Sequence, residues 1–199
     1  MNIENPQFGP KIPSKQEIQW KKVRAEVEEM ADALGEGIDE GIKETVIAFN
    51  INEIPTSQSC EGHFEDGSDH GFPAPWVTIS APNEPEWRYK NEEETLEYKK
   101  WYEENKKLFA KVEVLLKEFY TGRDVPEEVR IIIDKMDNVF DVHNGGKFFI
   151  PNDRKERLQT ELTEEERQRI PKVLKNCQKE MQDFTDFLKK KYFSNETQA

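Results

Sequence analysis

The chain has few cysteines and no long apolar run, and these two scarcities exclude several classes of protein. Its 199 residues contain only two cysteines, Cys60 and Cys177, which is too few for a disulfide framework. No window approaches the roughly 18 consecutive apolar residues that a membrane-spanning helix requires. The first 13 residues lack a basic stretch followed by an apolar one, as a secretory leader would have. We therefore expect a cytoplasmic protein with reduced thiols and no membrane partner.

Positive charge is also scarce. The chain carries 29 lysines and arginines against 41 aspartates and glutamates, which gives a formal net charge of −12. Such a surface repels phosphate backbones at long range, so a nucleic-acid partner is disfavoured. A small molecule or another protein is the expected partner.

The composition fits one folded domain. Apolar residues and charged residues each make up 35% of the chain, and aromatic residues make up 11%, which argues against disorder. We expect a loose leader over residues 1–13, a single domain over 14–193 and a frayed tail over 194–199. No internal repeat divides the domain.

Four amphipathic helices are predicted from apolar residues at spacings of three and four. A capping box of Ser14 and Glu17 opens the first, and its apolar face runs to Leu34 before Gly35. Pro171 predicts a break or kink near residue 170. Cys177 falls in the apolar stripe of the last helix and is expected to pack in the core. The other helices are expected over residues 39–50, over 92–120 with Leu96 on its apolar face, and from Thr163 onward.

Strand signals lie between these helices. Asn144 and Gly145 form the dipeptide preferred in a type I′ hairpin turn, so the last three strands should form a meander. The expected fold is α+β: a small, mostly antiparallel sheet of four or five strands packed with four or so amphipathic helices. The strands are expected over residues 56–60, 76–80, 129–134, 139–143 and 147–150.

One stretch, Thr56-Ser57-Gln58-Ser59-Cys60-Glu61-Gly62-His63, concentrates the possible chemistry of the chain. Cys60 and His63 have the spacing of two metal ligands that share one turn, and a thiolate with an imidazole suits zinc. His70 in the same loop and His143 at a strand end could complete the set. The alternative is structural, with Cys60 as a small buried hydrophobe and His63 capping the turn opened by Gly62.

Two further hypotheses concern the same stretch. Cys60 could be a nucleophile with a histidine as its base. The backbone amides of residues 59–62 could instead form an anion-binding nest, with Ser57 and Ser59 as donors. Acidic neighbours argue against a strongly charged phosphate in such a nest.

The order of features over residues 49–80 resembles a group of uncharacterised bacterial and phage proteins. They share a helix, an asparagine, a Thr-x-x-Ser-Cys-x-Gly-His segment matching Thr56 to His63, and a following strand. The resemblance implies a site at this strand-to-loop junction but no particular activity. Glu53 stands where the group usually has glycine. The segment is also similar to the tRNA wybutosine-synthesis methyltransferase family, although His63 replaces that family's arginine.

Three functions remain open on this basis. The first is a small-ligand-binding or partner-binding, regulatory protein whose polar site is formed by Ser57, Ser59, Cys60, Glu61, Gly62 and His63. The second is a zinc-type metal-dependent enzyme that uses Cys60 and His63 with His70 or His143. The third is an interaction protein in which the loop is purely structural.

Overall fold

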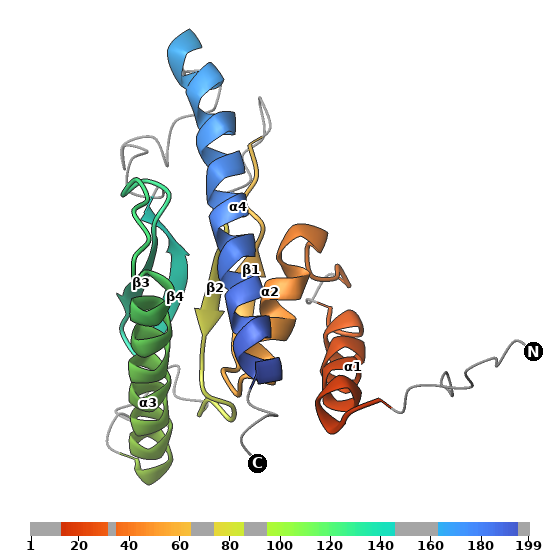
Figure 1. Ribbon diagram of the computed structural model, residues 1–199. Coiled ribbons are helices and arrows are strands. Elements are labelled where there is room, and N and C mark those ends of the chain that lie inside the picture. The colour runs from red at the N-terminus through yellow and green to blue at the C-terminus, as the bar shows by residue number, and fades with distance from the viewer. Residues whose placement is uncertain (1–12, 32–34, 65–73, 86–94, 146–162, 195–199) are drawn as a thin grey trace, which may run out of the picture.

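A computed structural model of the chain describes residues 13–31, 35–64, 74–85, 95–145 and 163–194. The described part is α+β, as predicted: helices pack against a small antiparallel sheet (Figure 1). In chain order the elements are α1 (Lys15–Glu28), α2 (Glu40–Ile51), β1 (Thr56–Cys60), β2 (Trp76–Ile79), α3 (Leu96–Phe119), β3 (Ile131–Met136), β4 (Val139–Asn144) and α4 (Glu164–Ser194).

The sheet has the order β1-β2-β4-β3, and all its neighbours are antiparallel. Because side chains alternate between the two faces of a strand, the register separates an apolar face from a polar one. The apolar face joins the helices in one core, in which Phe184 of α4 lies 5.9 Å from Phe49 of α2 between ring centroids. The sheet residues of that core are Val77, Ile79, Ile131, Phe140 and Val142.

The opposite face of the sheet is polar. Trp76 pairs with His143, and Thr78 pairs with Asp141, across β2 and β4. The Thr78 hydroxyl donates a 2.6 Å hydrogen bond to Asp141 Oδ1. His143 lies on this face, opposite to the face on which its neighbour Val142 joins the core.

The first helix begins as predicted and ends early. Ser14 and Glu17 form the capping box. The helix ends at Glu28 instead of Leu34, because the chain turns back there and Ala31 makes an antiparallel bridge with Gly37. The predicted Leu34 lies outside the described residues.

The two long helices each differ from prediction at one point. Thr95 caps α3, so Leu96 occupies the first position of the helix and is 70% exposed rather than buried. The expected break at Pro171 is wrong, because α4 runs through it. A proline removes one hydrogen bond and crowds the preceding turn, yet the 31-residue helix continues, and its buried residues, from Cys177 to Leu188, all lie beyond Pro171. Cys177 is fully buried, as expected.

The β3–β4 hairpin is confirmed, whereas the turn predicted after β4 is not. Asp137 adopts a positive φ of 50° in the turn. The type I′ turn at Asn144 is wrong, since Asn144 extends β4 and pairs with Ile131. The Gly145 amide donates to the Arg130 carbonyl at 2.7 Å, which closes this end of the hairpin. The strand expected over 147–150 lies outside the described residues.

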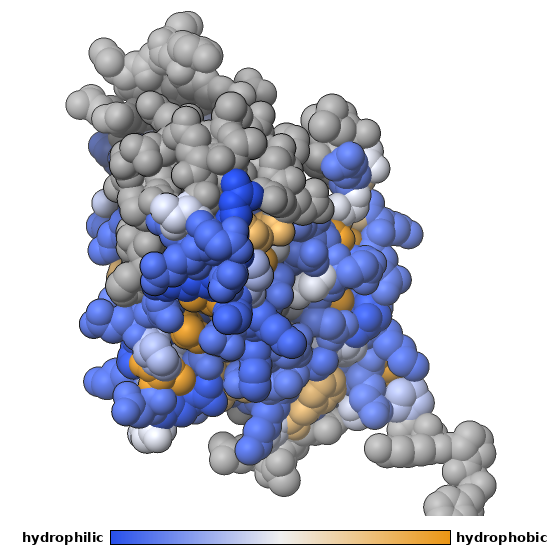
Figure 2. Space-filling model, turned by 90° about the horizontal axis from the view of Figure 1, so that it is seen from above, coloured by the Kyte–Doolittle hydropathy of each residue, from blue (hydrophilic) through white to orange (hydrophobic). Residues whose placement is uncertain are grey.

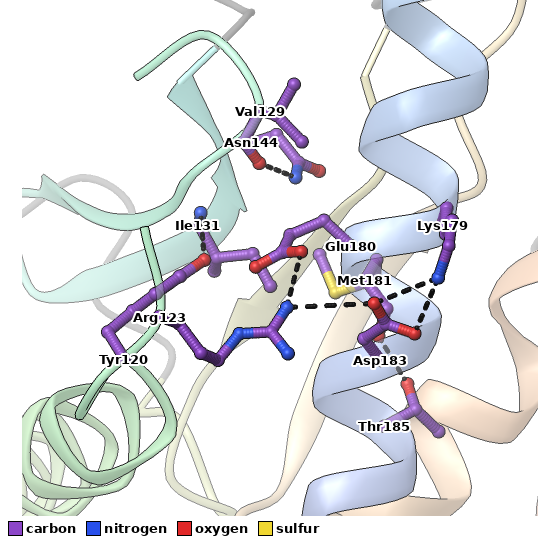
Figure 3. A network of polar contacts seen from close by, with 10 residues as sticks. All are labelled: Tyr120, Arg123, Val129, Ile131, Asn144, Lys179, Glu180, Met181, Asp183 and Thr185. Atoms are coloured by element: carbon purple, nitrogen blue, oxygen red, sulfur yellow. Dashed lines mark hydrogen bonds and ion pairs between the residues drawn. The ribbon is translucent and has the colours of Figure 1, made fainter. Parts of the chain in front are cut away.

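A polar network fastens α4 to the end of α3 (Figure 3). Arg123 donates to the buried carboxylate of Glu180 at 2.8 Å and lies 3.6 Å from Asp183. The Tyr120 hydroxyl accepts the Ile131 amide at 2.7 Å. The network thus fixes α4 relative to the start of β3, and α4 in turn supports the loop after β1.

The surface is mostly hydrophilic in the view of Figure 2, where apolar colour is confined to small separate areas. No helix in the described ranges is both long and apolar enough to cross a membrane.

Candidate functional site

The candidate site lies where β1 ends and the chain passes the start of α2. Cys60 is the last residue of β1, and Gly62 follows with a φ of +78°. The Gly62 amide donates to Cys60 Sγ at 3.4 Å. This turn lets the chain double back, so that His63 comes beside Asp39 at the start of α2.

Asp39 occupies the N-cap position of α2, but its side chain does not cap the helix. Its Oδ2 atom instead accepts the Glu61 amide at 3.1 Å and lies 3.3 Å from His63 Nε2. The missing cap comes from Glu61, whose Oε2 accepts the Gly41 amide at 2.6 Å. Glu61 therefore caps α2 in place of Asp39. The Asp39 carboxylate instead lies beside Cys60 and His63.

Asp39, Cys60 and His63 form a potential metal-ligand group. One donor atom from each lies within 4.8 Å of the other two. All three residues are half-buried. Carboxylate, thiolate and imidazole are all ligands that zinc accepts.

The electrostatics of Cys60 favour a cation at this position. Burial raises the pKa of the Cys60 thiol above its ordinary value, and the carboxylates of Asp39 and Glu61 raise it further, against the opposing Gly62 amide. A thiol in such surroundings is a poor nucleophile, because the thiolate is the reactive form. The environment therefore weakens the hypothesis of nucleophilic catalysis and suits a site whose negative charge a metal would offset.

Helix α4 supports the loop from the other side. The Gln178 side-chain amide donates to the carbonyls of Glu61 and Gly62, at 3.2 and 3.4 Å. Leu174 packs so closely that a side-chain carbon on Gly62 would lie 2.9 Å from its Cδ1 atom. The loop is therefore fixed by α2 and α4 together.

Of the other sequence-predicted ligands, His143 is described and lies apart from the group. Trp76 pairs with Cys60 on one side and with His143 on the other, which puts the Cα atoms of Cys60 and His143 about 10 Å apart at ordinary strand spacing. The His143 ring is fully buried, contacts the Asn144 carbonyl through Nδ1 and lies 3.8 Å from Asp134 through Nε2. It is not part of the group. His70 lies outside the described residues.

The other cysteine takes no part in the site. Cys177 is fully buried, and its thiol donates a long 3.5 Å hydrogen bond to the Glu128 carbonyl. Burial raises the pKa of this thiol to about 12, and Glu128 and Glu180 add to the rise. It packs in the interior, as the sequence indicated.

A groove of about 450 Å³ adjoins the group. It runs beside β1, and both Ser57 and Ser59, which were expected at the site, line it. Asp39 belongs to both the groove and the potential metal-ligand group. The other residues of the described ranges that line the groove are Met30, Ala31, Glu36, Gly37, Ile38, Val46, Thr56, Gln58 and Trp76.

Sequence reasoning missed Asp39. An aspartate before a helix is the ordinary signature of an N-cap, and the sequence assigned it only the start of α2. The signal that distinguishes it is tertiary: the cap is supplied by Glu61, 20 residues beyond Gly41, whose amide it accepts. No protein-family model, curated protein or solved structure matches the chain, so the site is assigned from its own geometry.

Proposed function

We propose that the protein binds a zinc-type divalent cation through Asp39, Cys60 and His63, and that a ligand in the adjoining groove completes the coordination of the metal. The observation that carries this proposal is the convergence of three different donors within 4.8 Å. They come from two segments about 20 residues apart. The small-ligand-binding function and the metal-dependent function then describe one site.

The fit of the group to zinc can be judged from bond lengths. Zinc binds oxygen, nitrogen and sulfur at about 2.0–2.3 Å, so tetrahedral ligand atoms lie about 3.5 Å apart. The contact between His63 Nε2 and Asp39 Oδ2, at 3.3 Å, already meets this spacing. The widest separation within the group must shrink by an amount on the order of 1 Å. Side-chain rotation can supply this movement, because none of the three residues is fully buried.

Three protein ligands leave one tetrahedral position for water or a ligand, which is the pattern of catalytic rather than structural zinc. A bound metal would lower the pKa of that water toward neutrality. Glu61 is a further acid beside the group, with Oε1 3.9 Å from His63 Nδ1. Metal-assisted hydrolysis is therefore the second candidate function, favoured by the adjoining groove.

Metal content tests the proposal directly. The purified protein, stripped with chelator and reloaded with zinc, should retain about one zinc per chain. Cys60→Ser, His63→Ala and Asp39→Asn should each lose most of it, because two remaining ligands do not hold zinc firmly. The control is Glu40→Gln, which removes an 87% exposed acid beside Asp39 and should leave the content unchanged. Mass spectrometry of the metal provides the measurement.

The same experiment can reject the site. Wild-type protein without retained zinc, or the three variants with undiminished zinc, would contradict the proposal. Cobalt loading gives an independent check, since a thiolate–cobalt charge-transfer band should appear in wild type and vanish in Cys60→Ser. Circular dichroism of each variant separates loss of ligand from loss of fold.

Metal affinity should depend on pH in a defined direction. The Cys60 thiol holds its proton at neutral pH because its pKa is raised, whereas the metal binds the thiolate. Each binding event therefore releases a proton, and the association constant should rise about tenfold per pH unit while the pH stays below the thiol pKa. Calorimetric titration at several pH values measures the slope. A flat profile would show that Cys60 does not coordinate.

A further inference from the structure

A second groove lies between α3 and β3, at the opposite edge of the sheet from β1 (Figure 1). It has a volume of about 670 Å³. We call it the α3–β3 groove. Its apolar lining comes from both elements, with Phe109 and Leu116 on the helix and Ile132 and Ile133 on the strand.

Val114 extends this apolar lining onto the surface of α3. It lines the α3–β3 groove and is 63% exposed. Ala110, which is also exposed and lines the same groove, lies one turn earlier on the same face of the helix. A single exposed valine is ordinary on a protein surface. An apolar helix face that continues into an apolar groove is instead typical of a protein–protein contact.

Two charged side chains flank Val114, and neither has an ion pair in the described part of the chain. These are Glu113 and Lys117, both of which line the α3–β3 groove. Every other charged side chain from Glu103 to the end of α3 is paired within the chain. The pairs are Glu103 with Lys106, Glu104 with Lys107, Lys111 with Glu53, and Glu118 with Lys191.

The signs and spacing of these two charges match a second copy of the same surface. If a two-fold axis passes through Val114, the α3 helices of two copies run antiparallel. Lys117 of one copy then lies level with residue 111 of the other, two residues from Glu113. At 1.5 Å per residue this is an offset of about 3 Å along the helix, within the reach of both side chains. Parallel helices would instead place Glu113 against Glu113.

We propose that a second copy of the chain covers the α3–β3 groove, with the two α3 helices antiparallel across a two-fold axis at Val114. The same patch would serve both copies, as a two-fold interface requires. Two ion pairs between Glu113 and Lys117 would flank the apolar contact. The proposal is independent of the metal site, because none of the described residues that line this groove belongs to the metal-ligand group or to the groove beside β1.

The association should be weak. A contact centred on one pair of helices is smaller than the roughly 800 Å² per partner of a standard interface. The net charge of −12 also makes two copies repel each other at long range. We therefore expect a dissociation constant on the order of tens of micromolar at physiological salt, where this repulsion is largely screened.

Sedimentation equilibrium of the metal-free protein, over a range of concentrations, measures the dimer. Val114→Asp should weaken dimerisation at least about tenfold, because it places two carboxylates together at the axis. The matched control is Leu96→Asp, which changes a 70% exposed apolar residue at the start of the same helix, outside the groove. It should leave the dissociation constant unchanged. Both positions are exposed, so circular dichroism should show an intact fold in each variant.

Charge reversal gives the sharper test. Glu113→Lys and Lys117→Glu should each weaken dimerisation about tenfold, because each brings like charges together twice across the axis. An equimolar mixture of the two variants should dimerise again, since the lysines of one then face the glutamates of the other. A general charge effect would separate the two variants, because Glu113→Lys reduces the net negative charge and Lys117→Glu increases it.

Three results would overturn the inference. A wild-type chain that stays monomeric at millimolar concentration would leave the groove to a partner of another kind. A dimer that Val114→Asp and Leu96→Asp weaken equally, or not at all, would place the contact elsewhere. Failure of the mixed charge variants to dimerise, when wild type does, would reject the antiparallel pairing of Glu113 with Lys117.

Discussion

Replacing Gly62 by alanine is expected to lower the free energy of unfolding by about 3 kcal/mol. Gly62 has a φ of +78°, which costs energy for a residue with a side chain. The added carbon would also lie 2.7 Å from the Ala74 carbonyl carbon and 2.9 Å from the Pro75 nitrogen. Backbone atoms cannot yield as a flexible side chain can, so the loop must shift. Urea denaturation followed by circular dichroism measures the loss.

Gly122→Ala is the matched control. Gly122 has nearly the same φ, +75°, but an added carbon there meets nothing within 4 Å. It should therefore cost only the conformational strain, about 1 kcal/mol. The difference between the two variants isolates the close packing around Gly62. Equal losses would contradict the tight packing of the loop against residues 74 and 75.

Phe184→Ala should produce a comparable or larger loss, about 3–5 kcal/mol. Phe184 is fully buried at the centre of the core. Its ring lies 5.9 Å from that of Phe49 and 5.1 Å from that of Phe119, so it joins α2, α3 and α4. Alanine would leave a cavity among large rings that cannot collapse to fill it. The midpoint of urea unfolding reports the change.

Phe193→Ala on the same helix serves as the control. Phe193 is 36% exposed and lies near the end of α4, beside Trp20 and Tyr192. Its removal should cost about 1 kcal/mol, since about a third of its surface is already in water and it lies outside the core. If the two variants unfolded at the same urea concentration, the core would not be centred on Phe184.

Much of the fold could be predicted because its signals are local. Ser14 and Glu17 are three residues apart and satisfy each other's amides whatever the remainder of the chain does. Cys177 falls in an apolar stripe whose burial requires only that the helix pack. The α+β class follows from amphipathic helices together with strands joined by short turns, because strands joined by a short turn pair antiparallel.

The candidate site was only half predictable, because its other half depends on tertiary contacts. Cys60 and His63 are close in sequence, so their spacing signals a shared turn. Asp39 joins them only because α2 begins beside the end of β1. The sequence allowed His143 to converge with them, but the strand order places Trp76 between it and Cys60. Strand order cannot be predicted from any local sequence pattern.

The hydrogen bonds that Asp39 and Glu61 accept from each other's segments also determine how this part of the molecule unfolds locally. The first turn of α2 is closed by a carboxylate from a loop beyond β1, and that loop is held by an acid from the helix start. Neither segment can loosen without removing a hydrogen bond from the other. The two therefore form one cooperative opening unit, in which order at the loop is transmitted to the amides of the helix.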